Sequence, residues 1–350
     1  MTMDDVRFGI LGSGNMATVY ADALATQVTG GRLVAVAGGS RAPAFAKEHG
    51  GEFEPSVEAL VDRPDVEVVV IATPHSAHAA QAVAAAEAGK HVYLEKPMAL
   101  DVAECDRILE ATRRAGVKLT VAKQTRHGDP EMKARQLIDD GVIGDIRYIR
   151  PMSPTIGAGL APGNHWSADP KEGKAFLDWG CHCCDAIRWL SGSEATRVHA
   201  EFTAFSPYPE APDPTAIVQM RLASGALVQI FMSYEVPPPG YGTRSNNQYS
   251  IIGSKGIVEF DLDTLRLGTE RGWETLIDLP TWINPLQPRN PRRIKRTALQ
   301  VQGFIDALRE GREPAITGED GRAAVEMAQA AIQSAATGQV VGLPLERVPA

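Results

Sequence analysis

Short apolar strands alternate with helices along the chain from Val6 to Ala122. The segment 66–72, VEVVVIA, is apolar almost throughout, as expected for a strand that helices cover on both faces. Because such strands and helices form βαβ units with right-handed crossovers, this part of the chain predicts a doubly wound parallel sheet. The strands are predicted at 6–11, 32–37, 66–72, 91–94 and 118–122, and the helices at 15–27, 42–49, 77–88 and 102–115.

The pattern changes after Gln124. A stretch rich in Pro and Gly at 151–163 separates a helix at 131–140 from another around Asp178. Hairpins follow, with strands at 215–222, 226–234, 249–252 and 257–260, and the last helix is predicted at 318–336. We therefore expect two domains, 1–123 and 124–350. The second is α+β and mostly antiparallel, and its last helix is able to pack back on the first domain.

One strand of the second domain lacks a polar face. Along residues 227–232, LVQIFM, both alternating faces are largely apolar. The domain's own helices can cover one face, and the other face needs a second cover. The strand therefore predicts a partner subunit, in a homodimer or homotetramer formed through the C-terminal sheet.

Charge and hydropathy limit the partners of the 350-residue chain. Its net charge of -8 argues against nucleic acid, which selects basic surfaces, and the basic run at 289–296 is interpreted as a solvated surface segment. No apolar run reaches the ~18 residues of a membrane helix, and the acidic start, MTMDD, does not resemble a secretory leader. A cytoplasmic protein that binds neither membranes nor nucleic acid is expected.

Three of the four cysteines lie together, at Cys181, Cys183 and Cys184, around His182. Adjacent cysteines rarely bridge one another, and a cytosolic protein keeps its thiols reduced. Consecutive helical residues point in different directions, so these four cannot close a tetrahedron around one zinc ion. Neither a disulfide framework nor a metal site is predicted.

A glycine-rich sequence, Gly12-Ser13-Gly14-Asn15-Met16-Ala17, lies between the first strand and the first helix. Gly12 permits a tight turn, Gly14 lets the backbone approach a pyrophosphate, and the helix N-terminus supplies N–H donors. G-x-G-x-x-A in this position predicts that residues 1–123 are a Rossmann domain that binds a dinucleotide.

The choice of dinucleotide depends on the end of the second strand. An NAD enzyme usually has an acidic residue there for the ribose 2′-hydroxyl, but this chain reads Ala37-Gly38-Gly39-Ser40-Arg41. Ser40 and Arg41 could hold a 2′-phosphate, which favours NADP over NAD. In the alternative, Arg41 only begins a surface helix, and the enzyme uses NAD.

Two further segments supply groups for proton and hydride chemistry. Lys96 precedes Pro97 at the end of a predicted strand, and Asp178 and His182 stand at i and i+4, on one face if the segment is helical. A base, a carboxylate and a cation suit the removal of a proton from an alcohol as hydride leaves. The alternatives are ordinary ion pairs at the surface, and Asp185 could either orient His182 or cap structure.

With these motifs the chain resembles the Gfo/Idh/MocA oxidoreductases, which include glucose–fructose oxidoreductase and inositol dehydrogenases. The resemblance covers nearly the whole chain, including 12–17, ATPHSAH at 72–78, GKHVYLEKP at 89–97, GVIG at 141–144, 178–185 and SAATG at 334–338. It implies a second domain with an open mixed sheet that commonly packs against another subunit. The family often has Asn at the position of His75, and a glycine run where Lys174 stands, so the role of Lys174 is open.

The resemblance implies roles for individual residues. Lys96, Asp178 and His182 become the catalytic group and touch the substrate, and Trp166 is a candidate for the wall of the substrate pocket. The expected reaction moves a hydride between the nicotinamide and a secondary alcohol of a sugar, cyclitol or glycoside. The alternatives are elimination or glycoside cleavage with transient use of bound NAD, and a non-enzymatic dinucleotide sensor. The expected cofactor contacts are Gly12, Ser13, Gly14, Asn15, Met16, Ser40, Arg41, Thr73, Pro74, His75, His78, Glu95 and Lys96.

Overall fold

The computed structural model describes residues 5–156, 169–205, 214–237, 248–280 and 289–345. The chain divides into two compact units: unit 1 comprises residues 1–127 and 284–322, and unit 2 comprises 128–283 and 323–350. No helix in the described ranges is long and apolar enough to cross a membrane.

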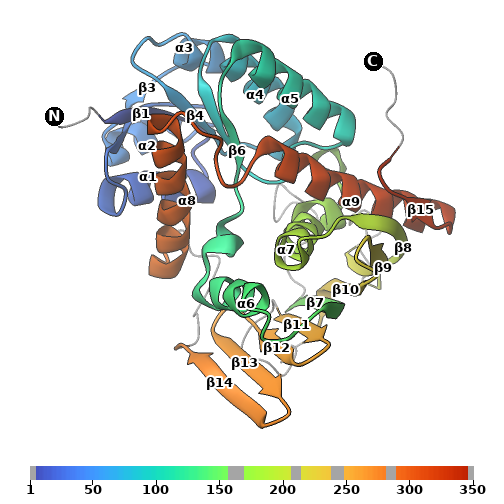
Figure 1. Ribbon diagram of the computed structural model, residues 1–350. Helices are drawn as coiled ribbons and strands as arrows, with labels where there is room; N and C mark the ends of the chain where they lie inside the picture. The colour runs from blue at the N-terminus through green and yellow to red at the C-terminus, as the bar shows by residue number, and fades with distance from the viewer. Residues whose placement is uncertain (1–4, 157–168, 206–213, 238–247, 281–288, 346–350) are drawn as a thin grey trace. The chain divides into compact units, whose positions relative to one another are not determined.

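Unit 1 is built on a six-stranded sheet (Figure 1). Its strand order is β3-β2-β1-β4-β5-β6, and every neighbouring pair is parallel. The order reverses between β1 and β4, the point at which doubly wound sheets bind ligands beyond the carboxyl ends of their strands. The predicted Rossmann sheet is confirmed. Its strands are β1 (Val6–Leu11), β2 (Gly31–Ala37), β3 (Glu52–Phe53), β4 (Val68–Ile71), β5 (His91–Leu94) and β6 (Leu119–Val121).

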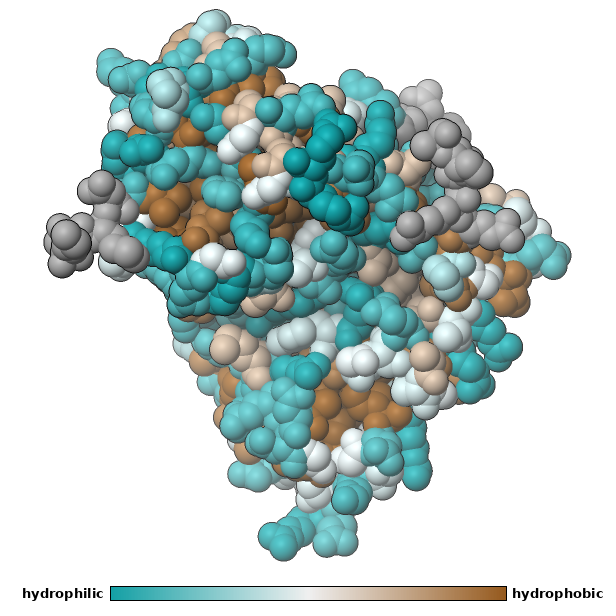
Figure 2. Space-filling view, turned by 45° about the horizontal axis from the view of Figure 1, so that its top comes forward, coloured by the Kyte–Doolittle hydropathy of each residue, from teal (hydrophilic) through white to brown (hydrophobic). Residues whose placement is uncertain are grey.

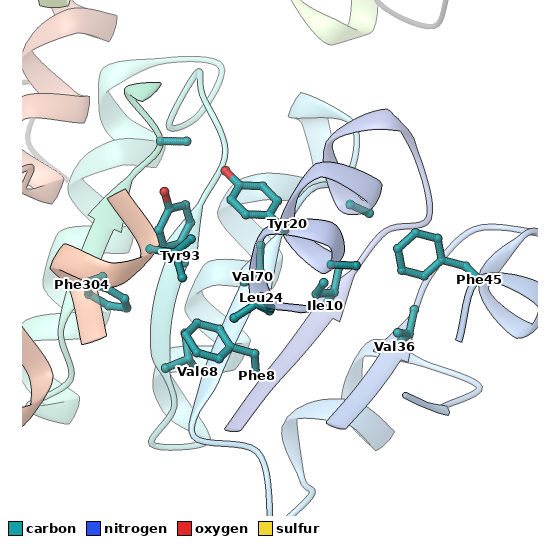
Figure 3. Close-up of a cluster of buried hydrophobic side chains, with 14 of the residues drawn as sticks. Phe8, Ile10, Tyr20, Leu24, Val36, Phe45, Val68, Val70, Tyr93 and Phe304 are labelled. Atoms are coloured by element: carbon teal, nitrogen blue, oxygen red, sulfur yellow. The ribbon is translucent and has the colours of Figure 1, made fainter. Parts of the chain in front are cut away.

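The helices of unit 1 enclose an apolar core. Tyr93 on β5 lies between Tyr20 and Phe304 (Figure 3), and both ring pairs meet edge to face, with centroids 5.2 and 5.8 Å apart. Phe304 comes from a helix nearly 200 residues further along the chain, so the core joins distant segments. The helices are α1 (Asn15–Thr26), α2 (Ala42–His49), α3 (Val57–Val61), α4 (His78–Glu87), α5 (Val102–Ala115) and α8 (Pro291–Arg309), with 3-10 turns η1 (His75–Ala77) and η2 (Gln124–His127).

The position of α8 differs from the division expected from the sequence, which assigned all of 124–350 to the second domain. In the structure, residues 284–322 belong to unit 1. Gln300 explains the return: its Nε2 donates to the Val121 carbonyl and its Oε1 accepts from the Lys123 N–H, so α8 is bonded to the end of β6. Side chains of α8 also enter the core, Phe304 among them.

The interpretation of residues 289–296 as a solvated segment is wrong for part of its length. Arg289 is exposed and pairs with Asp22 and Glu48 on the surface of unit 1. Arg293 is half-buried and Arg296 is only 7 % exposed. The helical spacing places both arginines on the inner side of α8. The composition of the segment alone did not indicate this burial.

Unit 2 is built on a nine-stranded sheet of order β14-β13-β12-β11-β7-β10-β9-β8-β15. Among the described strands, β7 and β10 alone pair in parallel, so the expected open, mostly antiparallel mixed sheet is confirmed. The strands are β7 (Ile146–Ile156), β8 (Ala195–Thr203), β9 (Thr215–Leu222), β10 (Leu227–Val236), β11 (Gln248–Gly253), β12 (Ile257–Phe260), β13 (Thr264–Thr269), β14 (Gly272–Asp278) and β15 (Val341–Gly342). The unit also contains α6 (Asp129–Asp139), α7 (Cys181–Ser191) and most of α9 (Gly318–Thr337).

The central strand β7 was not predicted. From the sequence, residues 151–163 are identified only as a stretch rich in Pro and Gly. Prolines cannot donate to a β-ladder and are rare inside sheets. The structure nevertheless pairs Pro151 with Tyr249 of β11 and Pro154 with Ser233 of β10. The strand β7 continues past its prolines because it pairs with a neighbouring strand on each side.

The surface combines a hydrophilic background with separate hydrophobic patches, as the face in Figure 2 shows. In unit 2, alternate side chains of β9 and β10 point to opposite faces of the sheet. Val218 and Ile230 are buried, whereas Ile217 and Leu227 are exposed. Strand β10 therefore has an apolar residue on each face, as the sequence predicted.

Phe304→Ala should destabilise unit 1 by about 3–5 kcal/mol, because it removes a buried ring and leaves a cavity beside Tyr93. Urea unfolding followed by circular dichroism measures the change. Leu299→Ala is the matched control: Leu299 lies on the same helix but is 42 % exposed, and its loss should change stability by no more than about 0.5 kcal/mol. Equal losses in the two variants would contradict the packing of α8 on the sheet.

Candidate active site

The glycine loop has no free space beside Gly12 but has free space beside Gly14. Gly12 has a φ of 112°, and a Cβ there would lie 2.4 Å from the carbonyl oxygen of Ala72, so only glycine fits beside the end of β4. At Gly14 a Cβ would meet only the Arg41 side chain, at 3.8 Å. Gly14 has no side chain to cap α1, so the N–H groups of the first turn are left for an anion. The loop fits a dinucleotide pyrophosphate.

The end of β2 brings Arg41 to the same loop. Ser13 Oγ donates to the Gly38 carbonyl at 3.2 Å, which joins the glycine loop to the chain after β2. Gly38 and Gly39 have φ of 85° and 82°, and they turn the backbone toward Ser40 and Arg41, both exposed. The guanidinium of Arg41 therefore lies beside Gly14, with no acidic residue in segment 38–41 to occupy it.

His78 joins two segments that the sequence associated with the cofactor. It is fully buried, with Nδ1 2.8 Å from the Pro97 carbonyl oxygen and Nε2 3.1 Å from that of Thr73. Both partners accept only, and a neutral imidazole can donate to just one of them. Burial lowers the pKa of His78, while the two carbonyls oppose that shift. Both ring nitrogens face protein, so His78 holds Thr73 and Pro97 together.

The remaining predicted contacts on this loop differ in exposure. The Thr73 hydroxyl donates to Gln81 at 2.6 Å, which ties the loop to α4. His75 is 3 % exposed, and its ring meets that of His78 edge to face, with centroids 5.7 Å apart. Pro74 is exposed and immediately precedes the turn η1. The side chains of Thr73 and His75 thus both contact other side chains of the protein.

Glu95 fixes the end of β5, just before Lys96. It is 5 % exposed, and its Oε1 accepts from the Tyr20 hydroxyl at 2.5 Å and from Gln124 Nε2 at 3.0 Å. Its Oε2 accepts from the Lys96 N–H at 3.1 Å, and the Lys96–Pro97 peptide bond is cis. Burial, followed by the charge of Glu95, raises the pKa of the Tyr20 hydroxyl, which therefore stays a donor. Segments from α1, η2 and β5 thus hold the backbone of Lys96.

In unit 2, Asp178 and His182 lie at a change of helix type. The sequence predicted one helical face, but Asp178 belongs to a π-helical turn, Phe176–Gly180, and His182 to the first turn of α7. A Cβ on Gly180 would lie 2.8 Å from the Phe176 ring, so this turn requires glycine. Single π-helical turns of this kind often occur at functional sites.

The surroundings of Asp178 include a residue that the sequence did not indicate. Burial raises the pKa of Tyr234 on β10, and the charge of Asp178 raises it further, which places the phenol near that carboxylate. The rings of Trp179 and His182 meet edge to face, with centroids 5.4 Å apart. No local sequence pattern links Tyr234 to Asp178, because they belong to elements that are far apart in the sequence.

The other candidates of unit 2 are placed as follows. Asp185 and all four cysteines of the chain are buried, and the cysteines form no disulfide. Lys174 is exposed, and its carbonyl accepts from the N–H groups of Leu177 and Asp178. Trp166 lies outside the described residues. Among those that are described, no group of three or more His, Cys, Asp or Glu residues is placed to hold a metal ion.

A parallel sheet of this order, with a glycine loop at its switch point, defines a dinucleotide-binding protein. Residues 6–123 match the model of an oxidoreductase family with an NAD-binding Rossmann fold, and 132–259 match the C-terminal domain of the same family, GFO/IDH/MocA. The chain belongs to the Gfo/Idh/MocA family of oxidoreductases, as the resemblance implied.

Individual relatives match along their whole length. Inositol 2-dehydrogenase 1 of Saccharopolyspora erythraea is 30% identical over 99% of this chain and 98% of its own. The 1,5-anhydro-D-fructose reductase of Ensifer adhaerens is 28% identical, over 95% and 97%. The structure of scyllo-inositol dehydrogenase from Lactobacillus casei, with bound NAD(H) and scyllo-inositol, is 26% identical with a TM-score of 0.78, covering 97% of this chain and 99% of that one.

His127, at the end of η2, should make stability depend on pH. Burial, and then the charges of Arg126 and Arg296, lower its pKa from 6.5 to about 4. The unfolded chain therefore binds the proton more readily between pH 6.5 and about 4, and stability falls as the pH drops through that window. Thermal unfolding at pH 7 and pH 5 should show a smaller acid loss for His127→Gln than for the wild type. The same loss in both proteins would show that His127 is not the group responsible.

Proposed function

We propose that the protein is a cytoplasmic NAD(P)-dependent dehydrogenase that moves a hydride between the nicotinamide and a secondary alcohol of a sugar or cyclitol. One observation carries the proposal: within unit 1, the glycine loop after β1 and Lys96 after β5 lie at the carboxyl edge of one parallel sheet. A cofactor bound along that edge reaches from the glycine loop toward the lysine. Relatives named for inositols and for 1,5-anhydro-D-fructose support the substrate class.

The residues divide the chemistry between them. The nicotinamide, when bound, gives or takes the hydride at its C4. The segment 12–16 and the backbone of Thr73 and Pro74 hold the dinucleotide. The Lys96 ammonium donates to the reacting oxygen and stabilises negative charge there. Glu95 fixes the backbone of Lys96, since its carboxylate accepts from the Lys96 N–H. His182 takes the alcohol proton in the oxidative direction, and Asp178 orients it or binds a neighbouring hydroxyl.

A second copy of the chain completes the proposed assembly. On the outer face of the nine-stranded sheet, Ile217, Leu227 and Ile252 are 45%, 46% and 37% exposed. They lie on β9, β10 and β11; β10 and β11 flank β7 in the middle of the sheet, and β9 lies next to β10. Covering an apolar face of this kind favours a homodimer or homotetramer formed through the C-terminal sheet.

Lys96→Met should lower kcat by about 100- to 1,000-fold, because the variant loses the cation at the reacting oxygen. Cofactor affinity should change little, since the pyrophosphate contacts lie on residues 12–16. Turnover is measured with a panel of sugars and inositols by absorbance of the reduced nicotinamide, and affinity by quenching of Trp fluorescence. A variant that keeps more than roughly a tenth of the wild-type kcat would place the electrostatic stabilisation elsewhere.

The cofactor preference is proposed to be NADP, because Arg41 lies beside Gly14 and segment 38–41 has no acidic residue. A charge-assisted bond to the 2′-phosphate should favour NADP by about 10- to 150-fold. Arg41→Ala should remove most of that preference and leave NAD affinity unchanged. Lys47→Ala, an exposed cation of the same helix α2, is the control and should keep the preference. Wild-type protein that binds NAD as tightly as NADP would overturn the NADP assignment alone.

A further inference from the structure

Arg293 in the first turn of α8 reaches the glycine loop from the far end of the sequence. Its Nη2 lies 2.8 Å from the Sδ of Met16, which is 277 positions earlier. Figure 1 shows α8 alongside α1 in unit 1, and the two helices are in contact. Asn290 caps α8 and accepts from the N–H of Arg293 at 3.5 Å, so the start of the helix has a defined backbone.

The guanidinium lies where two predicted cofactor segments meet. Met16 belongs to the first turn of α1, and Glu95 lies between β5 and Lys96. Burial lowers the pKa of Arg293, and the charge of Glu95 opposes that shift. An arginine keeps its charge in a protein, so α8 adds a half-buried positive charge to this edge of the sheet.

Phosphate oxygens accept the two parallel N–H bonds of a guanidinium fork. The first-turn N–H groups of α1 attract an anion to the same place, because the helix begins at Gly14 without a side-chain cap. An anion at the start of α1 is therefore within the reach of both donors.

We propose that Arg293 binds the diphosphate of the dinucleotide cofactor, opposite the N–H groups of the glycine loop. The proposal rests on the proposed function, which supplies the dinucleotide. It assigns a cofactor contact to a helix of the second half of the chain, outside the G-x-G-x-x-A motif. Because the diphosphate is common to NAD and NADP, Arg293 strengthens the binding of both, whereas Arg41 distinguishes between them.

The test is calorimetric titration with ADP-ribose, which has the diphosphate but no nicotinamide and cannot take part in turnover. Arg293→Met should weaken ADP-ribose binding by about 10- to 100-fold, the loss expected for a charge-assisted contact with an anion. NAD and NADP should lose affinity by the same factor. Lys295→Met, an exposed cation on the same turn of α8, is the matched control and should bind ADP-ribose as the wild type does.

The other outcomes are distinct. ADP-ribose binding that is unchanged in Arg293→Met overturns the role of Arg293 and leaves the proposed function standing. A wild-type protein that binds neither ADP-ribose nor NAD overturns both. If Arg293→Met does not fold, Arg293→Lys decides the question: the ammonium cannot make the two parallel bonds, so weaker ADP-ribose binding supports the proposal and unchanged binding overturns it.

Discussion

The hydrogen bonds of the Glu95 carboxylate are the interaction on which the candidate site of unit 1 depends. A buried carboxylate is costly unless donors surround it, and here Tyr20, Gln124 and the N–H of Lys96 donate to it. Their bonds join α1, η2 and β5 at one point. The helix that begins at the glycine loop is therefore tied to the segment that leads from β5 to Lys96. This coupling sets the cofactor loop and the lysine at one edge of the sheet.

The return of α8 to unit 1 completes the same edge. The amide of Gln300 bonds to the backbone at the end of β6, and Phe304 packs against Tyr93, two residues before Glu95. The packing of Phe304 and the hydrogen bonds of Gln300 together hold α8, and α8 positions Arg293 next to the start of α1. A segment from the second half of the chain becomes part of the dinucleotide-binding unit, and the first 127 residues do not form that unit alone.

Local patterns predicted the parts of the fold that depend on local physics. The glycine loop and strand–helix alternation predicted the Rossmann sheet because turn chemistry and periodicity act within a few residues. The strand β7 was missed, because its prolines obscured a pairing that only neighbouring strands supply. The inward-facing arginines of α8 and the approach of Tyr234 to Asp178 had no local signal, because both arise from contacts between distant segments. Family resemblance contributed the roles of Lys96, Asp178 and His182, which remain proposals.

In the proposed reaction, hydride passes directly between the cofactor and a carbon of the substrate. This transfer can be followed with reduced cofactor that carries deuterium at the transferred C4 position, supplied with the ketone form of an accepted sugar or inositol. Direct transfer predicts that mass spectrometry and NMR will find one deuterium on the new carbinol carbon, from one face of the nicotinamide only. Product without deuterium, or with deuterium taken from labelled solvent at that carbon, would contradict direct hydride transfer.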